Sequence, residues 1–192
     1  MVDAGVIHEI NEATALEYFS RLDALVKPGT ELYVIGGSAI ALLGAKIRTT
    51  ADVDVALPYS KLDIAAFGEA SAKAGLPVDP AFGYQGAYIE LVKPLMLTLP
   101  KPKSEESLQV LFQGANLTVK TGSGADLVAS KLYRYSEQDR EDVQFLMLRG
   151  GVTFEAVRES VTRLPERFRE DVMTVENLGN LERDLAVWRA ER

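Results

Sequence analysis

Two short groups of residues have the types and spacing that phosphate chemistry needs. The first is Gly36-Gly37-Ser38, which follows the apolar run at 32–35. A glycine pair after a strand lets the backbone turn tightly and approach a ligand without a Cβ clash. At the start of a following helix, unpaired N–H groups and the Ser38 hydroxyl favour a phosphate. We therefore expect Gly36, Gly37 and Ser38 to form a phosphate-binding turn.

The second group is Asp52-Val53-Asp54-Val55, which is separated from Ser38 by thirteen residues. Side chains alternate between the two faces of a strand, so both carboxylates are expected on one face. Two carboxylates on one face suit Mg²⁺, which prefers one or two carboxylates together with substrate phosphates. Taken singly, each group has a simpler interpretation, an ordinary turn or an exposed strand edge. Their combination at this spacing favours a metal and phosphate site.

This combination resembles the signature of the nucleotidyltransferase fold shared by polymerase-beta-like enzymes. That signature is an apolar residue, Gly, Gly or Ser, a short spacer, and then acid-apolar-acid-apolar; Gly37, Ser38, Asp52 and Asp54 fill it. The resemblance implies an NTP substrate, Mg²⁺ or Mn²⁺ as cofactor, and transfer of a nucleoside monophosphate to an acceptor hydroxyl. Asp52 and Asp54 are then catalytic metal ligands, and Gly36, Gly37 and Ser38 bind the nucleotide.

The same family expects a third carboxylate on a neighbouring strand. Glu90 is the best-placed candidate, because it is a lone acid in the apolar, alternating segment 88–91. Asp79 is a weaker rival, since an Asp before Pro is usually part of a turn. The third position is therefore Glu90, Asp79 or absent. We expect Glu90 to be the catalytic one, deprotonating the acceptor or holding a second metal ion.

A narrower resemblance is carried by Arg48-Thr49-Thr50-Ala51-Asp52. It is similar to the Arg-x-Thr-x-Asp stretch of nucleotidyltransferase-like toxins of abortive-infection systems and their uncharacterised stand-alone relatives. The resemblance implies a nucleotide-binding role for Arg48, whose guanidinium can hold a phosphate bidentately. The alternative is a salt bridge from Arg48 to one of the aspartates.

A second block, 125–142, supports that narrower resemblance. The relatives carry a similar Leu-x-x-x-Lys-Leu helix followed by Arg-x-x-x-x-Asp-x-x-Asp, which matches Lys131, Arg134, Asp139 and Asp142. On one continuous helix, Lys131 and Asp142 share a polar stripe. We expect Lys131 to bind the triphosphate, and Asp139 and Asp142 to fix Lys131 or Arg134 in place. The alternative is a solvated helix face with ion pairs.

The elements that must position these residues follow from periodicity. Apolar runs bounded by turn residues predict strands, and apolar residues at helical spacing predict helices. The expected strands are 32–35, 52–55, 87–92 and 117–120, with 108–112 as a partner of the last. The expected helices are 11–26, 38–43, one that ends at 74, 131–149, 153–164 and 180–192. Asn11 is expected to cap the first, and a capping box at 60–63 to open the third. The segment 131–149 is either one helix or two with a break at Ser136.

These elements predict an α/β (α+β) fold: a small mixed sheet flanked by helices, with a helical C-terminal part. We expect two parts, a nucleotidyltransferase-like core over 1–122 and helices over 123–192 packed on that core. The segment 93–107 holds three prolines and several charges and is expected to be a loop.

Composition narrows the chemistry further. The chain has 192 residues, no cysteine and one histidine, so thiolate chemistry is excluded and a Ser-His triad or a multi-histidine metal site is nearly so. The net charge of −7 argues against general binding of duplex DNA, which depends on a basic excess. No apolar run is long enough to span a membrane and no secretory signal begins the chain, so we expect a cytoplasmic protein.

The acceptor stays open at this point. The resemblance allows an RNA end such as that of tRNA, a protein hydroxyl or a small molecule, and a toxin-like role with a cognate antitoxin. The alternatives are a non-catalytic nucleotide-binding protein on the same fold, and an interaction protein of the toxin–antitoxin type.

Overall fold

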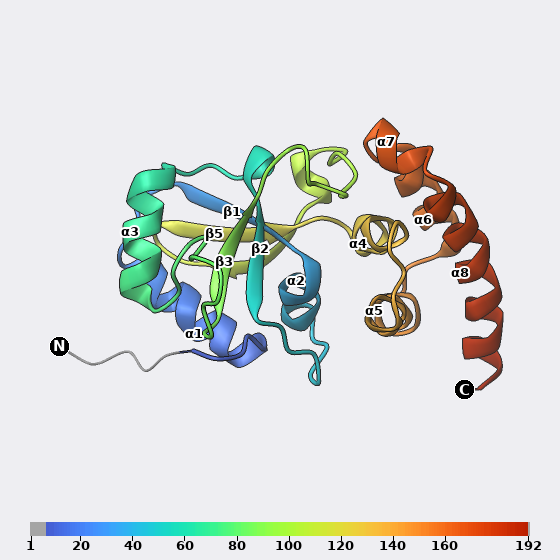
Figure 1. Ribbon diagram of the computed structural model, residues 1–192, viewed down its shortest axis with the longest axis horizontal. Coiled ribbons are helices and arrows are strands. Elements are labelled where there is room, and N and C mark those ends of the chain that lie inside the picture. The colour runs from blue at the N-terminus through green and yellow to red at the C-terminus, as the bar shows by residue number, and fades with distance from the viewer. Residues whose placement is uncertain (1–6, 192) are drawn as a thin grey trace. The chain divides into compact units, whose positions relative to one another are not determined.

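The computed structural model describes residues 7–191, which divide into two compact units (Figure 1). The first unit comprises the residues up to Leu97 together with Gln109–Thr121. The second comprises Thr98–Leu108 together with the residues from Gly122 onward. The chain therefore passes between the units near 97, 109 and 122. No helix of the described residues combines the length and apolar character that crossing a membrane needs.

A five-stranded mixed sheet forms the centre of the first unit. Its strands are β1 (Thr30–Ile35), β2 (Asp52–Ala56), β3 (Tyr88–Val92), β4 (Gln109–Gln113) and β5 (Leu117–Thr121), in the order β3-β2-β1-β5-β4. β2 runs parallel to β3 and β1 parallel to β5, whereas β1–β2 and β4–β5 are antiparallel. The predicted mixed sheet with flanking helices is confirmed.

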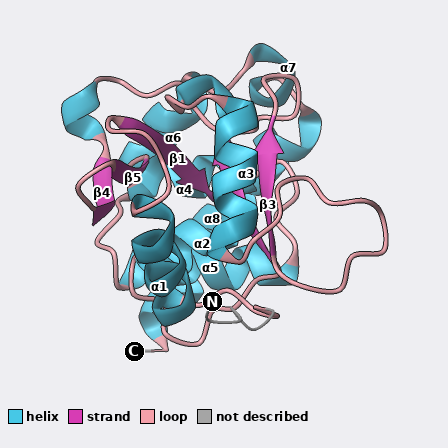
Figure 2. Cartoon of the chain, turned by 90° about the vertical axis from the view of Figure 1, so that its left-hand side faces the viewer, coloured by secondary structure: helices cyan, strands magenta, loops and turns pink. Residues whose placement is uncertain are grey.

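Three α-helices and a short 3-10 turn complete the described part of this unit. They are α1 (Glu12–Asp23), α2 (Gly36–Leu42), the turn η1 (Leu57–Tyr59) and α3 (Ile64–Ala74). α1 packs against both α2 and α3 (Figure 2). The core they share with the sheet is apolar and includes Tyr18, Phe19, Leu22, Tyr33, Val34, Ile40, Val53, Val55 and Ile89. Burial of Val53, Val55 and Ile89 leaves the opposite face of β2 and β3 for polar residues.

Several boundaries in the first unit differ from the prediction: α2 begins at Gly36 rather than at 38, so that the glycine pair is its first turn, and β1 begins at Thr30 rather than at 32. α1 begins after its Asn11 cap as expected but ends at Asp23, three residues short of 26. The Asp23 carboxylate accepts backbone N–H groups of Asn116 and Leu117 at 2.8 and 2.7 Å, and so fixes the β4–β5 turn. The capping box at 60–63 is wrong: Asp63 caps α3, and the Ser60 hydroxyl accepts the N–H of Tyr33 on β1 instead.

The second unit is helical. Its elements are the short η2 (Glu105–Ser107) and the helices α4 (Gly124–Lys131), α5 (Glu137–Leu148), α6 (Phe154–Thr162), α7 (Glu166–Arg169) and α8 (Val172–Ala190). The break at Ser136 is confirmed, because Ser136 caps α5 and Tyr135 before it has a left-handed φ of 47°. The stripe expected on one continuous helix is therefore wrong. α7 was not predicted, and α8 begins earlier than residue 180 because Asp171 caps it.

Arg163 explains why Thr98–Leu108 belongs with these helices. Its guanidinium donates to the carbonyl of Lys101 at 2.5 Å and to the buried carboxylate of Asp126 on α4 at 2.5 Å. The N–H of Lys101 in turn donates to the Arg163 carbonyl at 3.3 Å. One arginine thus holds a loop of the second unit to two of its helices.

Candidate active site

Three carboxylates gather at the paired strands β2 and β3. The parallel register sets Asp54 opposite Glu90 and Asp52 opposite Tyr88. Because side chains repeat every two residues, Asp52, Asp54 and Glu90 lie on the same face. One oxygen of each lies within 4.8 Å of the others, and all three side chains are half-buried. Strand alternation and register together bring about this acidic cluster.

Asp79, the rival for the third position, has a different task. Its carboxylate accepts the backbone N–H of Leu91 on β3 at 3.0 Å, and its own backbone has a left-handed φ of 42°. Aspartate tolerates this conformation better than most residues do. Asp79 therefore anchors the turn before β3, and among the described residues the acidic cluster contains Glu90 in its place.

The cluster carries unfavourable electrostatics. Burial, together with the charges of Asp52 and Asp79, raises the pKa of Glu90. Burial and the charges of Asp52, Glu90 and Asp54 also raise the pKa of Tyr88, which lies beside them. Hard oxygen donors that crowd one another in this way are the donor set that Mg²⁺ or Mn²⁺ prefers. The three carboxylates therefore fit a divalent metal ion.

Asp52 is oriented by a neighbour that the sequence reasoning missed as a site residue. The Thr50 hydroxyl donates to Asp52 Oδ1 at 2.7 Å. Thr50 is itself fixed, because its backbone exchanges two hydrogen bonds with Ile10, of 2.8 and 3.0 Å. The signal was present in the sequence, since Thr50 is the threonine of the Arg-x-Thr-x-Asp stretch. Tyr88, also missed, is a polar residue two positions before Glu90.

Each glycine of the predicted turn makes room for a charged side chain. Gly36 has a φ of 66°, and a Cβ there would collide with the carboxylate of Asp54. A Cβ on Gly37 would lie 2.5 Å from Nη2 of Arg48. The pair therefore lets Asp54 and Arg48 approach the start of α2, and a side chain at either position would push one of them away.

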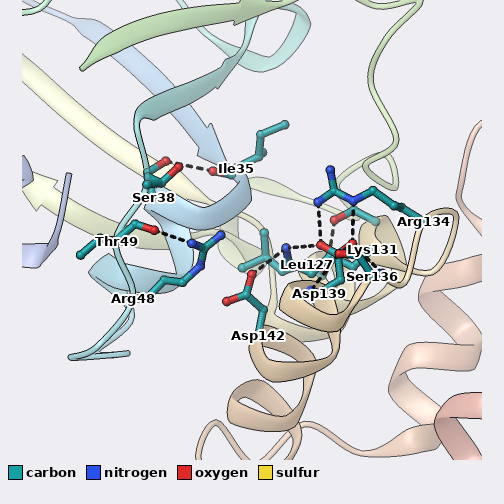
Figure 3. Close-up of polar contacts among 12 residues, drawn as sticks. Ile35, Ser38, Arg48, Thr49, Leu127, Lys131, Arg134, Ser136, Asp139 and Asp142 are labelled. Carbon is teal, nitrogen blue, oxygen red and sulfur yellow. Dashed lines mark hydrogen bonds and ion pairs between the residues drawn. The ribbon is translucent and has the colours of Figure 1, made fainter. Parts of the chain in front are cut away.

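Ser38 sits differently from the expectation for its hydroxyl. The residue is fully buried in the first turn of α2, and its hydroxyl donates to the carbonyl of Ile35 at 3.1 Å (Figure 3). Arg48, in the same unit, donates to the carbonyl of Thr49. The hydroxyl of Ser38 is thus engaged within the helix start, and its backbone N–H is the group at this residue suited to a phosphate.

Lys131, Asp139 and Asp142 meet in the second unit. Lys131, the last residue of α4, is 8% exposed, and Asp139 and Asp142 on α5 are 1% and 3% exposed. The Lys131 amine lies 3.0 Å from Asp139 and 2.9 Å from Asp142 (Figure 3). Contact between the two helices, rather than a shared helix face, brings them together.

Asp139 is the centre of this group. Its carboxylate accepts two hydrogen bonds from Arg134, at 2.7 and 2.8 Å, and one from the Ser136 hydroxyl at 2.8 Å. Burial acts to raise the pKa of Asp139, but Arg134, Lys131 and Ser136 outweigh it and lower that pKa. The buried Lys131, Asp139 and Asp142 carry one net negative charge, and the exposed Arg134 supplies the second positive charge that makes the group of four electrically neutral.

One of the comparisons with known proteins agrees with the fold. Residues 15–172 match the family model described as nucleotidyltransferase of unknown function (DUF6036). The match covers the glycine pair, the three carboxylates and the Lys131 group. No curated protein and no solved structure gives a significant match.

Proposed function

The chain belongs to the DUF6036 family of nucleotidyltransferases, and from this premise we propose that it transfers a nucleoside monophosphate from an NTP to an acceptor hydroxyl. The observation that carries the proposal is the half-buried cluster of Asp52, Asp54 and Glu90. The position of this cluster beside the glycine pair also supports the proposal, because Gly36 and Asp54 are in contact.

In this proposal, Asp52, Asp54 and Glu90 hold Mg²⁺ or Mn²⁺. A divalent ion bound there supplies neutralisation of the charge that develops on the phosphates during transfer. Thr50 keeps Asp52 in one orientation through its 2.7 Å hydrogen bond. A carboxylate that is held in place loses less freedom when it binds a ligand, which favours affinity.

The nucleotide contacts in the proposal come from the start of α2 and from Arg48. The backbone N–H groups of Gly36, Gly37 and Ser38 bind phosphate oxygens, since the first turn of a helix leaves such groups unpaired. Arg48 adds a guanidinium beside Gly37. It can bind a second phosphate oxygen pair in the bidentate manner.

Glu90 serves as the base for the acceptor. Its carboxylate lies with those of Asp52 and Asp54, and a carboxylate at the metal site is a group that can take the proton of a bound acceptor hydroxyl. The acceptor oxygen forms a bond to the α-phosphorus, the bond from that phosphorus to the bridging oxygen breaks, and pyrophosphate leaves. The acceptor proton passes to the Glu90 carboxylate.

We propose that Lys131 binds a phosphate of the NTP, with Asp139 and Asp142 as its positioning residues. The resemblance to the toxin-like relatives supports this role, and the buried amine between two carboxylates supports a fixed position for it. The conservative variant Lys131→Arg keeps the charge and tests the role. We expect it to raise KM for the NTP, with only a small fall in the melting temperature.

The experiment that tests the proposal is transfer of label from NTPs carrying ³²P at the α-phosphate, with Mg²⁺ and a cell extract as acceptor. We expect labelled product and pyrophosphate with the wild type, and loss of both in Asp52→Asn/Asp54→Asn. Glu176→Gln, an exposed acid on α8, is the matched control. Equal transfer by wild type and the double variant would refute the proposal.

The product identifies the acceptor. Sensitivity of the label to ribonuclease, to protease or to neither separates an RNA end, a protein hydroxyl and a small molecule. Growth arrest on expression, relieved by the double variant, would support a toxin-like role, and a co-purifying protein that blocks transfer would be the antitoxin. Binding of NTP without transfer to any fraction favours the nucleotide-binding alternative.

A further inference from the structure

We infer that the first unit has a second small-molecule site, which takes an amphipathic anion: a carboxylate with an aliphatic chain. The site is a pocket of about 440 Å³ between the turn that precedes β1 and the helix α3. This volume falls within the range of roughly 300–1,000 Å³ that is usual for ligand pockets. Its lining includes Leu25, Lys27, Thr30, Lys61, Ala66 and Phe67.

The inner surface of the pocket is apolar. Phe67 and Ala70, on α3, are buried and form part of it, together with the half-buried Val26 and Leu62. Leu25, at the edge, is 45% exposed. An exposed leucine beside an apolar hollow is surface that an aliphatic chain would remove from water, and that removal favours binding.

The rim carries the charge. Lys27, Lys61 and Lys73 face two acids of the lining, Asp63 and Glu69, so the rim has one positive charge in excess. The protein as a whole has a net charge of −7. Local positive charge on an acidic protein selects for an anionic ligand.

The lysines of the lining differ in the acids beside them. Lys27 lies 3.6 Å from Asp63. Lys73 stands four residues after Glu69 on α3, the spacing at which opposite charges on a helix attract. Within residues 7–191, no ion pair engages Lys61. The same holds for Lys73, so Lys61 and Lys73 are the lining lysines open to the carboxylate of the ligand, and Lys61, which has no acid at helical spacing on α3, is the one proposed to bind it.

The backbone around the pocket is fixed before any ligand arrives. The Thr30 hydroxyl donates to the Lys27 carbonyl at 2.7 Å, closing the turn. Lys61 and Glu31 exchange two backbone hydrogen bonds, of 2.8 and 2.9 Å. A preformed wall lowers the ordering cost of binding.

This pocket is distinct from the acidic cluster. Thr30, at the first residue of β1, lines the pocket, whereas Ile35, at its last residue, is paired with Asp54. Five residue steps along a strand separate them by roughly 17 Å. Binding there therefore requires neither a divalent metal nor an NTP.

Isothermal titration with decanoate tests the inference on the intact protein, with decylammonium as the probe of opposite charge. We expect saturable binding of decanoate to the wild type and much weaker binding of decylammonium. Ala66→Trp, which fills the pocket, should abolish decanoate binding. Lys61→Glu should weaken it at least roughly tenfold, whereas Lys93→Glu, an exposed lysine outside the pocket, should leave it unchanged.

Three results would overturn the inference: no saturable binding of decanoate, binding that Ala66→Trp and Lys61→Glu leave intact, or equal affinity for decylammonium. The double variant Asp52→Asn/Asp54→Asn is expected to bind decanoate as the wild type does. That arm separates the two proposals, because loss of nucleotide transfer leaves this pocket unchanged. Circular dichroism of each variant verifies that it is folded.

Discussion

Glu90 illustrates how one side chain serves the chemistry of the cluster at the expense of stability. Burial and the charges of Asp52 and Asp79 raise its pKa in the folded protein. A carboxyl group whose pKa is higher in the folded than in the unfolded state favours folding when protonated and opposes it when ionised. Ionised Glu90 therefore lowers the free energy of unfolding above the raised pKa, and this destabilisation disappears as the pH falls below that pKa.

The variant Glu90→Gln removes this cost. At pH 8 and without divalent metal, we expect it to raise the free energy of unfolding by about 0.5–1 kcal/mol and to abolish nucleotide transfer. The gain in stability should vanish near pH 4, where wild-type Glu90 is itself protonated. Urea denaturation at both pH values, with Glu176→Gln as control, measures the difference. A variant less stable than the wild type at pH 8 would contradict this account.

The three acids of the cluster could be predicted from the sequence, but their contacts with other residues could not. Asp52 and Asp54 follow from strand alternation, and Glu90 from the same alternation in the next apolar segment. The contact of Asp54 with Gly36 depends on the antiparallel register of β1 and β2, which a single sequence does not encode locally. The hydrogen bond of Thr50 to Asp52 likewise depends on the bridge to Ile10.

The paired helices α4 and α5 depend on Asp139 for their junction. Its carboxylate caps the start of α5 through Ser136 and joins the Lys131 amine at the end of α4. Since the pKa of Asp139 is lowered in the folded protein, its contribution to stability is complete above the unfolded pKa of about 3.9. It is lost as the pH falls from there toward the lowered folded value.

Asp139→Asn is therefore expected to destabilise the protein by about 3 kcal/mol at pH 7, because it leaves buried Lys131 with one carboxylate fewer. Below pH 4 the difference from the wild type should shrink. Denaturation in urea at pH 7 and pH 3 tests both statements. Glu137→Gln, an exposed acid in the first turn of the same helix, is the control. An equal loss at both pH values would show that the charge of Asp139 is not responsible.

Helix and strand identities were more predictable than their ends. Periodicity indicated α1, α3 and α6, but which polar residue caps a helix depends on competing partners. Ser60 has the right type for a cap, yet it is hydrogen-bonded to β1, and Asp63 takes that place. The break between α4 and α5 was open in the sequence, because a serine such as Ser136 can either cap a second helix or lie within a continuous one.

The division of the molecule into units is set by contacts between distant segments. The change from strand to helix patterns in the sequence predicts a boundary near 122; in the structure Thr121 is the last residue of the first unit and Gly122 belongs to the second. These patterns give no sign that Thr98–Leu108 joins the second unit, because that assignment depends on Arg163, more than fifty residues later in the chain. A single polar side chain without local periodicity leaves no such signal.

Arg163→Ala is expected to release this segment. It removes the hydrogen bond to the Lys101 carbonyl and leaves buried Asp126 without its 2.5 Å partner, at a cost of about 3 kcal/mol. Amide hydrogen exchange should become faster over 98–108 and stay unchanged over the strands β4 and β5. Arg158→Ala, an exposed arginine on α6, is the control. Unchanged exchange over 98–108 would contradict the role given to Arg163.

The central claim is that Asp52, Asp54 and Glu90 bind a divalent metal ion that carries the NTP. Electron paramagnetic resonance of free Mn²⁺ tests it most directly, because bound ions lose the sharp signal of the aqueous ion. We predict that the wild type with NTP removes Mn²⁺ from solution beyond what NTP does alone, and that Asp52→Asn/Asp54→Asn does not. Equal removal by the two proteins, or none by the wild type, would contradict the claim.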